Sequence, residues 1–260
     1  MSDNNEIDFK NIVVVNTKGG SSKSTVSLQV ASTFFLNKNQ DVNLYELDDE
    51  NLDSANFKKT KVNCSQIEIG NGEDLNSTLR TLLIKNDKNR VIDVGGNKTT
   101  TIFIEALIKS RMYKRVNLFI IPVSSGHQDV ENAKKTYDMI RELKVNTIFA
   151  LSRSRHNVSS SRVKFQYSNF FKSFTDKKYF VLQDSDVVDL SRTMKKSCFE
   201  LAQENETKNN LEKTLDEAFD KDNEVAIANA SVMLEILDDA KEFYKENLLQ
   251  AYEIIEKNIK

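Results

Sequence analysis

The sequence predicts an α/β protein in which a mostly parallel sheet is flanked by helices. Three observations support this prediction. Short β-rich runs alternate with helical stretches over the first two-thirds of the 260 residues, as in βαβ units. Glycine pairs lie just after two of these runs, at Gly19-Gly20 and Gly95-Gly96. From about residue 201 the chain reads as helix throughout.

The expected elements follow from composition and periodicity. Strands are expected at 11–15, 42–47, 62–69, 90–94, 118–123, 147–151 and 178–182. Helices are expected where apolar residues recur at helical spacing, at 24–37, 75–84, 101–112 and 130–143. We expect one domain over residues 1–260, with a core at about 11–200 and a helical C-terminal extension at about 201–260.

Composition excludes several classes. Only seven residues are glycine and one is proline, which argues against a linker or low-complexity chain. The longest apolar run, 118–123, is far shorter than the roughly 18 residues of a membrane span. Cys64 and Cys198 are the only cysteines, so no disulfide framework is expected. With no signal-peptide pattern at the start, a cytoplasmic protein is expected.

The first strand is followed by residues 16–25, NTKGGSSKST, and then by a helix. A phosphate-binding loop (P-loop) requires this context, because backbone N–H groups and a helix N-terminus together form an anion cradle. Lys23 is expected to reach the β- and γ-phosphates and Ser24 to bind Mg²⁺. Thr17 and Ser22 stand where the general motif has glycine, so a solvated turn capped by serine is the alternative.

The run Lys18-Gly19-Gly20-x-x-Lys23-Ser24-Thr25 resembles the deviant Walker A motif of the ParA/MinD family of P-loop ATPases. The resemblance covers roughly residues 11–200. It implies ATP and Mg²⁺ as cofactors and an ATP-bound homodimer, in which Lys18 reaches the phosphates of the other subunit. The implied nucleotide-binding residues are Lys18, Gly19, Gly20, Ser21, Ser22, Lys23, Ser24, Thr25 and Ser152. Ser152 stands where the family has an asparagine at the adenine, which leaves the base specificity open.

Two further segments extend the resemblance. Residues 44–51 look like the family's first switch segment, in which Asp48 would position the attacking water, and Glu46 replaces the usual first aspartate. Asp93 ends an apolar strand and would bind Mg²⁺ directly or through water, as in a Walker B strand. Gly95 and Gly96 would form the second switch. The implied catalytic residues are Lys18, Lys23 and Asp48.

A basic stretch lies between Leu151 and Lys178, where seven Lys and Arg residues face a single acid, Asp176. Cations, hydroxyls and amides together suit sequence-independent binding of a phosphate backbone. In the resembled family the ATP-bound dimer binds DNA non-specifically through this half. The expected DNA-binding residues are Arg153, Arg155, Arg162 and Lys164; Arg192, Lys195 and Lys196 would enlarge the patch. A solvated helix face is the alternative.

The last sixty residues are acidic, with 15 acids against seven lysines. An apolar stripe runs along their helices, and we expect it to pack on the domain or to make a dimer or partner contact. Interspersed glutamates argue against the membrane binding of MinD-type proteins. The stripe consists of Leu234, Leu237, Ala240, Tyr244, Leu248, Tyr252, Ile255 and Ile259.

The sequence therefore favours a ParA-like ATPase for plasmid or chromosome partition. It would bind DNA as an ATP-dependent dimer in a nucleoid-associated state and hydrolyse ATP slowly, stimulated by a ParB-like or other centromere-binding adaptor. Two alternatives stay open. One is a related ATPase that positions another cargo, in conjugation or cell division. The other is a nucleotide-binding module that no longer hydrolyses, motivated by Thr17, Ser22 and Glu46.

Overall fold

The computed structural model describes residues 9–47, 57–67, 72–85 and 87–260. Within these ranges seven strands form one all-parallel sheet in the order β3-β2-β4-β1-β5-β6-β7. The expected α/β fold class is therefore confirmed. The strands are β1 (Asn11–Val14), β2 (Val42–Leu47), β3 (Asn63–Gln66), β4 (Asn89–Val94), β5 (Leu118–Val123), β6 (Thr147–Ser154) and β7 (Tyr179–Gln183).

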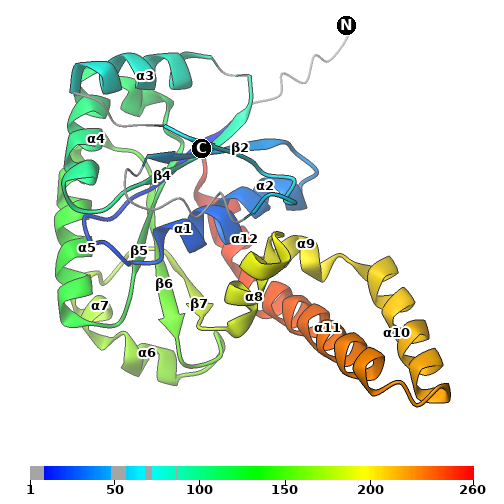
Figure 1. The fold of residues 1–260 in the computed structure, drawn as a ribbon. Helices are drawn as coiled ribbons and strands as arrows, with labels where there is room; N and C mark the ends of the chain where they lie inside the picture. Colours follow the sequence, from blue (N-terminus) through cyan, green and yellow to red (C-terminus); the bar gives the residue numbers. More distant parts are fainter. Residues whose placement is uncertain (1–8, 48–56, 68–71, 86) are drawn as a thin grey trace, which may run out of the picture.

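Helices cover both faces of the sheet (Figure 1). One face packs against α3 (Gly72–Ile84), α4 (Asn97–Lys109), α5 (His127–Ile140), α6 (Arg162–Gln166) and α7 (Ser168–Ser173). The other face packs against a continuous helix made of α1 (Lys23–Thr25), η1 (Val26–Ser32) and α2 (Thr33–Asn37), together with C-terminal helices. These are α8 (Asp186–Met194), α9 (Cys198–Ala202), α11 (Glu224–Phe243), η5 (Tyr244–Leu248) and α12 (Leu249–Asn258).

The order of the strands reverses at β1. Strands β2 to β4 lie on one side of it and β5 to β7 lie on the other. The chain leaves β1 at its carboxyl end and enters the helix that begins at Lys23. In open parallel sheets, ligands bind at the carboxyl ends of the strands beside such a reversal. The fold therefore places residues 16–25 at the position where a ligand is expected.

The C-terminal stripe packs on the sheet's helical layer, as expected. Leu237, Leu248 and Ile255 are buried in the same core cluster as Val26 and Phe34 of the first helix. The hydroxyl of Tyr252 also donates to Thr33 Oγ1 over 2.7 Å. Among the described residues, no helix is both long and apolar enough to cross a membrane.

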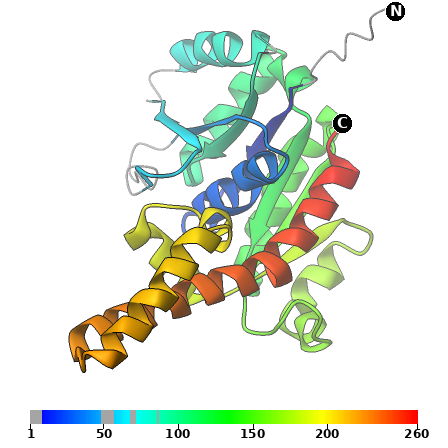
Figure 2. The ribbon, with the colours of Figure 1, turned by 90° about the vertical axis from the view of Figure 1, so that its right-hand side faces the viewer.

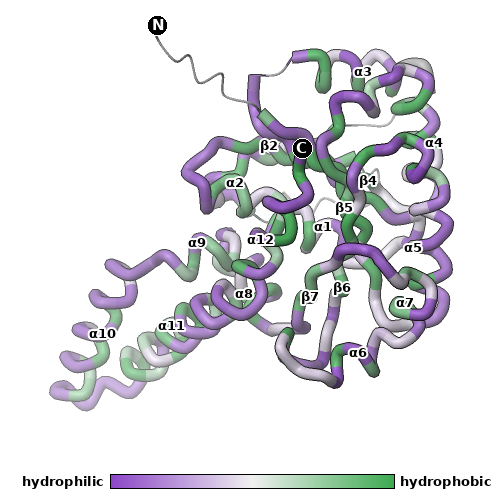
Figure 3. The backbone as a smooth tube through the Cα atoms, turned by 180° about the vertical axis from the view of Figure 1, so that it is seen from behind, coloured by the Kyte–Doolittle hydropathy of each residue, from purple (hydrophilic) through white to green (hydrophobic). Residues whose placement is uncertain are grey.

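One part of the C-terminal region stands apart from this packing. Helix α10 (Asn205–Asp220) and the first turns of α11 form an antiparallel hairpin that projects away from the sheet (Figures 1 and 2). Of α10, only Ala218 is buried. Helix α10 is mostly hydrophilic, whereas α11 mixes hydrophilic and hydrophobic residues along its length (Figure 3).

Candidate nucleotide-binding site

The loop after β1 adopts a conformation that needs two left-handed residues. Gly20 has φ 68° and Ser22 has φ 66°. The Ser22 side chain makes no capping hydrogen bond, and Ser21 Oγ instead donates to the Lys18 carbonyl over 3.0 Å. Capping by Ser22, one form of the solvated-turn alternative, is therefore not observed. Ser22 instead adopts the left-handed backbone conformation that glycine favours.

Neighbouring elements hold the start of the loop in place. The Asn16 side-chain amide donates to the Pro122 carbonyl of β5 over 2.6 Å, and its oxygen accepts from the Lys18 N–H over 2.9 Å. The Thr17 N–H donates to Thr136 Oγ1 of α5 over 3.0 Å. These bonds fix Thr17 by its backbone, so the motif's missing first glycine is compatible with an ordered loop.

The second glycine pair touches the first. A Cβ built on Gly96 would lie 2.9 Å from both the Cα and the N of Gly19. The two backbones therefore pack directly against each other, and only glycine at 96 leaves room for this contact. Gly95 N–H donates to the Leu47 carbonyl over 2.8 Å, which ties the same turn to the end of β2.

Two lysines converge on the loop. Lys23 is buried at the start of the helix, and its Nζ donates to the Lys18 carbonyl over 3.1 Å. Lys18 Nζ forms an ion pair with the carboxylate of Asp129, in the first turn of α5. The loop thus combines a helix N-terminus with two ammonium groups, an arrangement that attracts phosphate.

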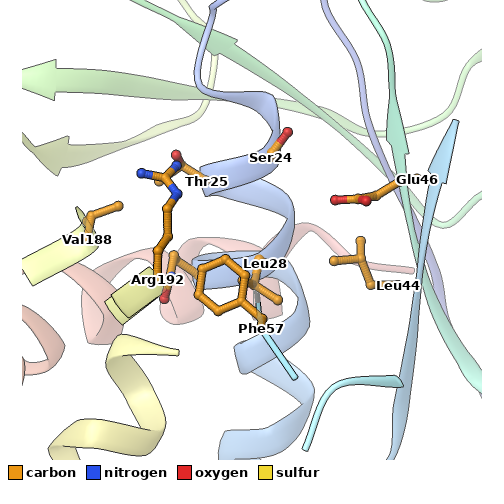
Figure 4. A pocket seen from close by; sticks show the side chains of 9 residues that line it. Ser24, Thr25, Leu28, Leu44, Glu46, Phe57, Val188 and Arg192 are labelled. Carbon is orange, nitrogen blue, oxygen red and sulfur yellow. The ribbon is translucent and has the colours of Figure 1, made fainter. Parts of the chain in front are cut away.

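Two carboxylates lie side by side next to this loop. Glu46 on β2 and Asp93 on β4 are register partners in neighbouring parallel strands, so their side chains share one face of the sheet. Both are buried. Figure 4 shows Glu46 and Ser24 facing the same space from β2 and from the helix. Hydroxyl and carboxylate oxygens are the ligands that Mg²⁺ prefers, and this donor set fits the ion.

Glu46 therefore lies beside Asp93, one of the two residues that the sequence predicts to bind Mg²⁺. Sequence reasoning treated Glu46 only as a substitution in a switch segment. Its alternation along β2 with the buried Val42 and Leu44 was the sequence signal that could have assigned it here. Asp48, the expected water-positioning residue, lies outside the described residues.

A cavity of about 330 Å³ opens beside the loop, between Ser22 and Thr25 on one side and the ends of β6 and β7 on the other. Ser152 contributes to its lining, and Ser152 Oγ is buried with no hydrogen-bond partner among the described residues. The neighbouring Tyr167 hydroxyl donates to the Ser152 carbonyl over 2.7 Å. Burial, with a contribution from the Asp184 charge, raises the pKa of Tyr167.

The four expected DNA-binding residues form one exposed surface at the end of β6 and on α6. Gln166 joins the two elements, because its side chain accepts from the Arg155 N–H and donates to the Arg153 carbonyl over 3.0 and 3.1 Å. Arg153, Arg155, Arg162 and Lys164 are all exposed. We call these four residues the basic surface.

Other cations of the stretch lie elsewhere. Arg192 lines the cavity beside the loop and pairs with Asp189, so it does not enlarge the basic surface as expected. Lys196 pairs with Glu204. Lys177 Nζ lies 4.5 Å from the centre of the Tyr137 ring and donates to its hydroxyl. These cations lie apart from the basic surface because each of them interacts with a partner that is close to it in the fold.

The fold and the loop together define the class, which is the P-loop α/β fold with a helical C-terminal part. No protein-family model matches the sequence, and no curated protein matches it either. Solved structures do match, and their fold is that of MinD and McdA.

Three of these structures illustrate the similarity. The MinD cell division protein of Aquifex aeolicus is 14% identical, with a TM-score of 0.52 over 71% of this chain and 86% of that chain. Apo McdA of Cyanthece is 13% identical, with a TM-score of 0.55 over 75% and 94%. An ATP complex of a Cyanothece McdA variant is 12% identical, with a TM-score of 0.50 over 92% and 97%. These neighbours are consistent with the resemblance to the ParA/MinD family.

Proposed function

We propose that this protein is a positioning ATPase of the ParA/MinD type, with residues 1–260 acting as one domain. The observation that carries the proposal is the geometry at the end of β1. There Lys23 begins a helix directly after a loop that contains two left-handed residues. The buried carboxylates Glu46 and Asp93 lie on the neighbouring strands β2 and β4. The ATP in the solved McdA variant complex, which shares the fold, supports ATP as the nucleotide.

The residues divide the work of phosphate chemistry among them. The N–H groups of residues 19–24 and the Lys23 ammonium would hold the phosphates, and Ser24, Asp93 and Glu46 would hold Mg²⁺. When bound, the metal neutralises charge that develops on the phosphates during transfer. Ser152 and the adjacent cavity would take the base and ribose. Lys18 would leave Asp129 to reach phosphates across an ATP-dependent homodimer.

Hydrolysis is tested by phosphate release from purified protein with Mg·ATP. Slow turnover is expected, and Asp93→Asn should abolish it because the metal loses an anionic ligand. Asp138→Asn, an exposed aspartate on α5, is the matched control and should keep the wild-type rate. Release by Asp93→Asn at the control's rate would contradict hydrolysis at this site and favour a module that only binds nucleotide.

We further propose that the cargo is DNA, as in plasmid or chromosome partition. The support is the basic surface, whose four cations are exposed and whose two segments, the end of β6 and α6, are held together by Gln166 through its bonds to the backbone of Arg153 and Arg155. ATP-dependent binding of random-sequence DNA should weaken steeply with salt, because each neutralised phosphate releases counterions. Reversing Arg155 and Arg162 to Glu should weaken it at least tenfold, about 1.4 kcal/mol. Unchanged DNA affinity would favour another cargo.

A ParB-like or other centromere-binding adaptor is the proposed stimulator of hydrolysis, acting on a nucleoid-associated pool. Its support is the resemblance of the loop and the switch segments alone. A pull-down of the ATP-bound protein with the product of a neighbouring gene is the direct test. If no partner raises phosphate release in the presence of DNA, a stimulated cycle is contradicted.

A further inference from the structure

Residues 205–243, which comprise the projecting hairpin and the rest of α11, carry a strongly acidic, partly apolar surface. They include 11 acidic residues against four lysines. Two of the four lysines are in ion pairs, Lys208 with Asp238 and Lys221 with Glu217. Most of the acidic groups are therefore left facing solvent, and the hairpin is unsuited to nucleic acid or to an anionic membrane.

Part of this charge is arranged as a stripe on α10. Glu212, Asp216 and Asp220 recur every four residues, so they lie on one face of the helix, and all three are exposed. Phe219 lies beside them with 57% of its surface exposed, and Val225, just past the tip, is 71% exposed. Exposed apolar side chains rimmed by polar residues occur at interaction surfaces, and Phe219 lies beside such a row of acidic groups.

The chain itself carries the complementary surface. On α6, Arg162 and Lys164 are exposed and flank Phe165, which is 87% exposed. Among the described residues neither cation is in an ion pair. In Figure 2 the hairpin and α6 extend on opposite sides of the same lower edge of the molecule, so one copy cannot join them.

We propose that the hairpin of one copy docks on α6 of a second copy. The acidic stripe would meet Arg162 and Lys164, and Phe219 would pack beside the partner's exposed aromatic residue. A two-fold axis that passes through the lower edge, between the hairpin and α6, would make the same contact in both directions. The dimer would therefore be closed. Because the acidic stripe and the basic helix α6 are on the same chain, a second copy of this chain is a better matched partner than an unrelated basic protein.

The same cations are proposed to bind DNA, so hairpin and DNA are alternative occupants of this surface. The docking proposal does not depend on the proposed ATPase activity. It is tested without nucleotide or DNA, so a failure of one proposal leaves the other standing.

The test is sedimentation velocity of the full chain at about 50 mM and about 500 mM salt, since screening weakens charge pairing. Wild type should self-associate at low salt and dissociate at high salt. Asp216→Lys with Asp220→Lys, and separately Arg162→Glu with Lys164→Glu, should each weaken association roughly tenfold or more. The quadruple variant, with both surfaces reversed, should restore it.

The matched control for the hairpin variant is Glu105→Lys with Glu142→Lys, which raises the net charge by the same amount at exposed positions outside both surfaces. It should associate like wild type. A monomeric wild type at low salt would overturn the proposal. So would hairpin variants that associate like wild type, or a quadruple variant that stays dissociated; binding of a separate basic protein by such a hairpin would then identify the other occupant.

Discussion

Ser22 is the residue at which this loop departs most from the general P-loop motif, and its backbone explains why it can. It lies in the left-handed region at φ 66°, where a Cβ is strained by about 1–2 kcal/mol. Ser22→Gly removes that strain but makes the unfolded chain more flexible, which offsets part of the gain. We expect a net stabilisation of about 0.5–1 kcal/mol in urea unfolding.

Gly20→Ala is the matched comparison, because it introduces the backbone strain that Ser22→Gly removes. Gly20 has φ 68° and open space around its Cβ position, so the change introduces backbone strain without a clash. It should destabilise the protein by about 1 kcal/mol or more. Equal effects of the two substitutions would show that the left-handed geometry does not govern this loop.

Gly96 is expected to tolerate no side chain, for a different reason. A methyl group there would press on the Gly19 backbone at 2.9 Å. Gly96→Ala should destabilise the protein by about 2 kcal/mol and weaken nucleotide binding, because the loop must shift. Gly19→Ala meets nothing within 4 Å and should change unfolding free energy little. Similar losses from both variants would contradict the packing described for this pair.

Local spacing and the family resemblance together pointed to Lys23 and Ser24, which follow β1, and to Asp93, which lies near the end of β4. They did not find the ion pair between Lys18 and Asp129, which joins residues 111 positions apart in the sequence. Nor did they place Arg192 beside the cavity. Such pairings depend on strand order and helix docking, which local patterns do not encode.

At the scale of elements, α12 is the helix that ties the C-terminal part to the P-loop helix. Ile255 is fully buried in the cluster that contains Val26 and Phe34. Ile255→Ala should cost about 2–5 kcal/mol in unfolding free energy, through lost burial and the cavity that remains. Ile254→Ala, one position along and only partly buried, should cost about 1 kcal/mol. Two small, equal losses would contradict packing of this stripe.

Periodicity predicted the strands and the long helices, because both patterns reflect which face is buried. It missed the short helices α6, α7, α8 and α9, which span too few turns for a clear period. One of them did carry a signal. Ser197 and Glu200 form a capping box at the start of α9, and that spacing is readable in the sequence.

For the whole molecule, the parallel sheet and its ligand edge were predictable, since alternating strands and helices allow few arrangements. The projecting hairpin was not, because its apolar positions resemble those of a packed helix. Only the fold shows that α10 buries a single residue and leaves Phe219 in solvent.

The family resemblance also implies an ATP-bound homodimer, which is a property of the whole molecule. A non-hydrolysable ATP analogue should shift the protein to a dimer in sedimentation at high salt, where the hairpin contact is screened, and ADP should not. Lys18→Ala should remain monomeric because no second ammonium reaches the phosphates. A dimer formed equally well by Lys18→Ala would exclude a role for Lys18 across the interface.

The loop after β1 is proposed to bind Mg·ATP. Calorimetric titration of the purified protein with a non-hydrolysable ATP analogue and Mg²⁺ tests it most directly. The wild type should bind. Lys23→Ala should bind at least about tenfold more weakly, because the buried ammonium beside Lys18 is lost. Absence of binding to the wild type, or equal affinity in Lys23→Ala, would contradict the claim.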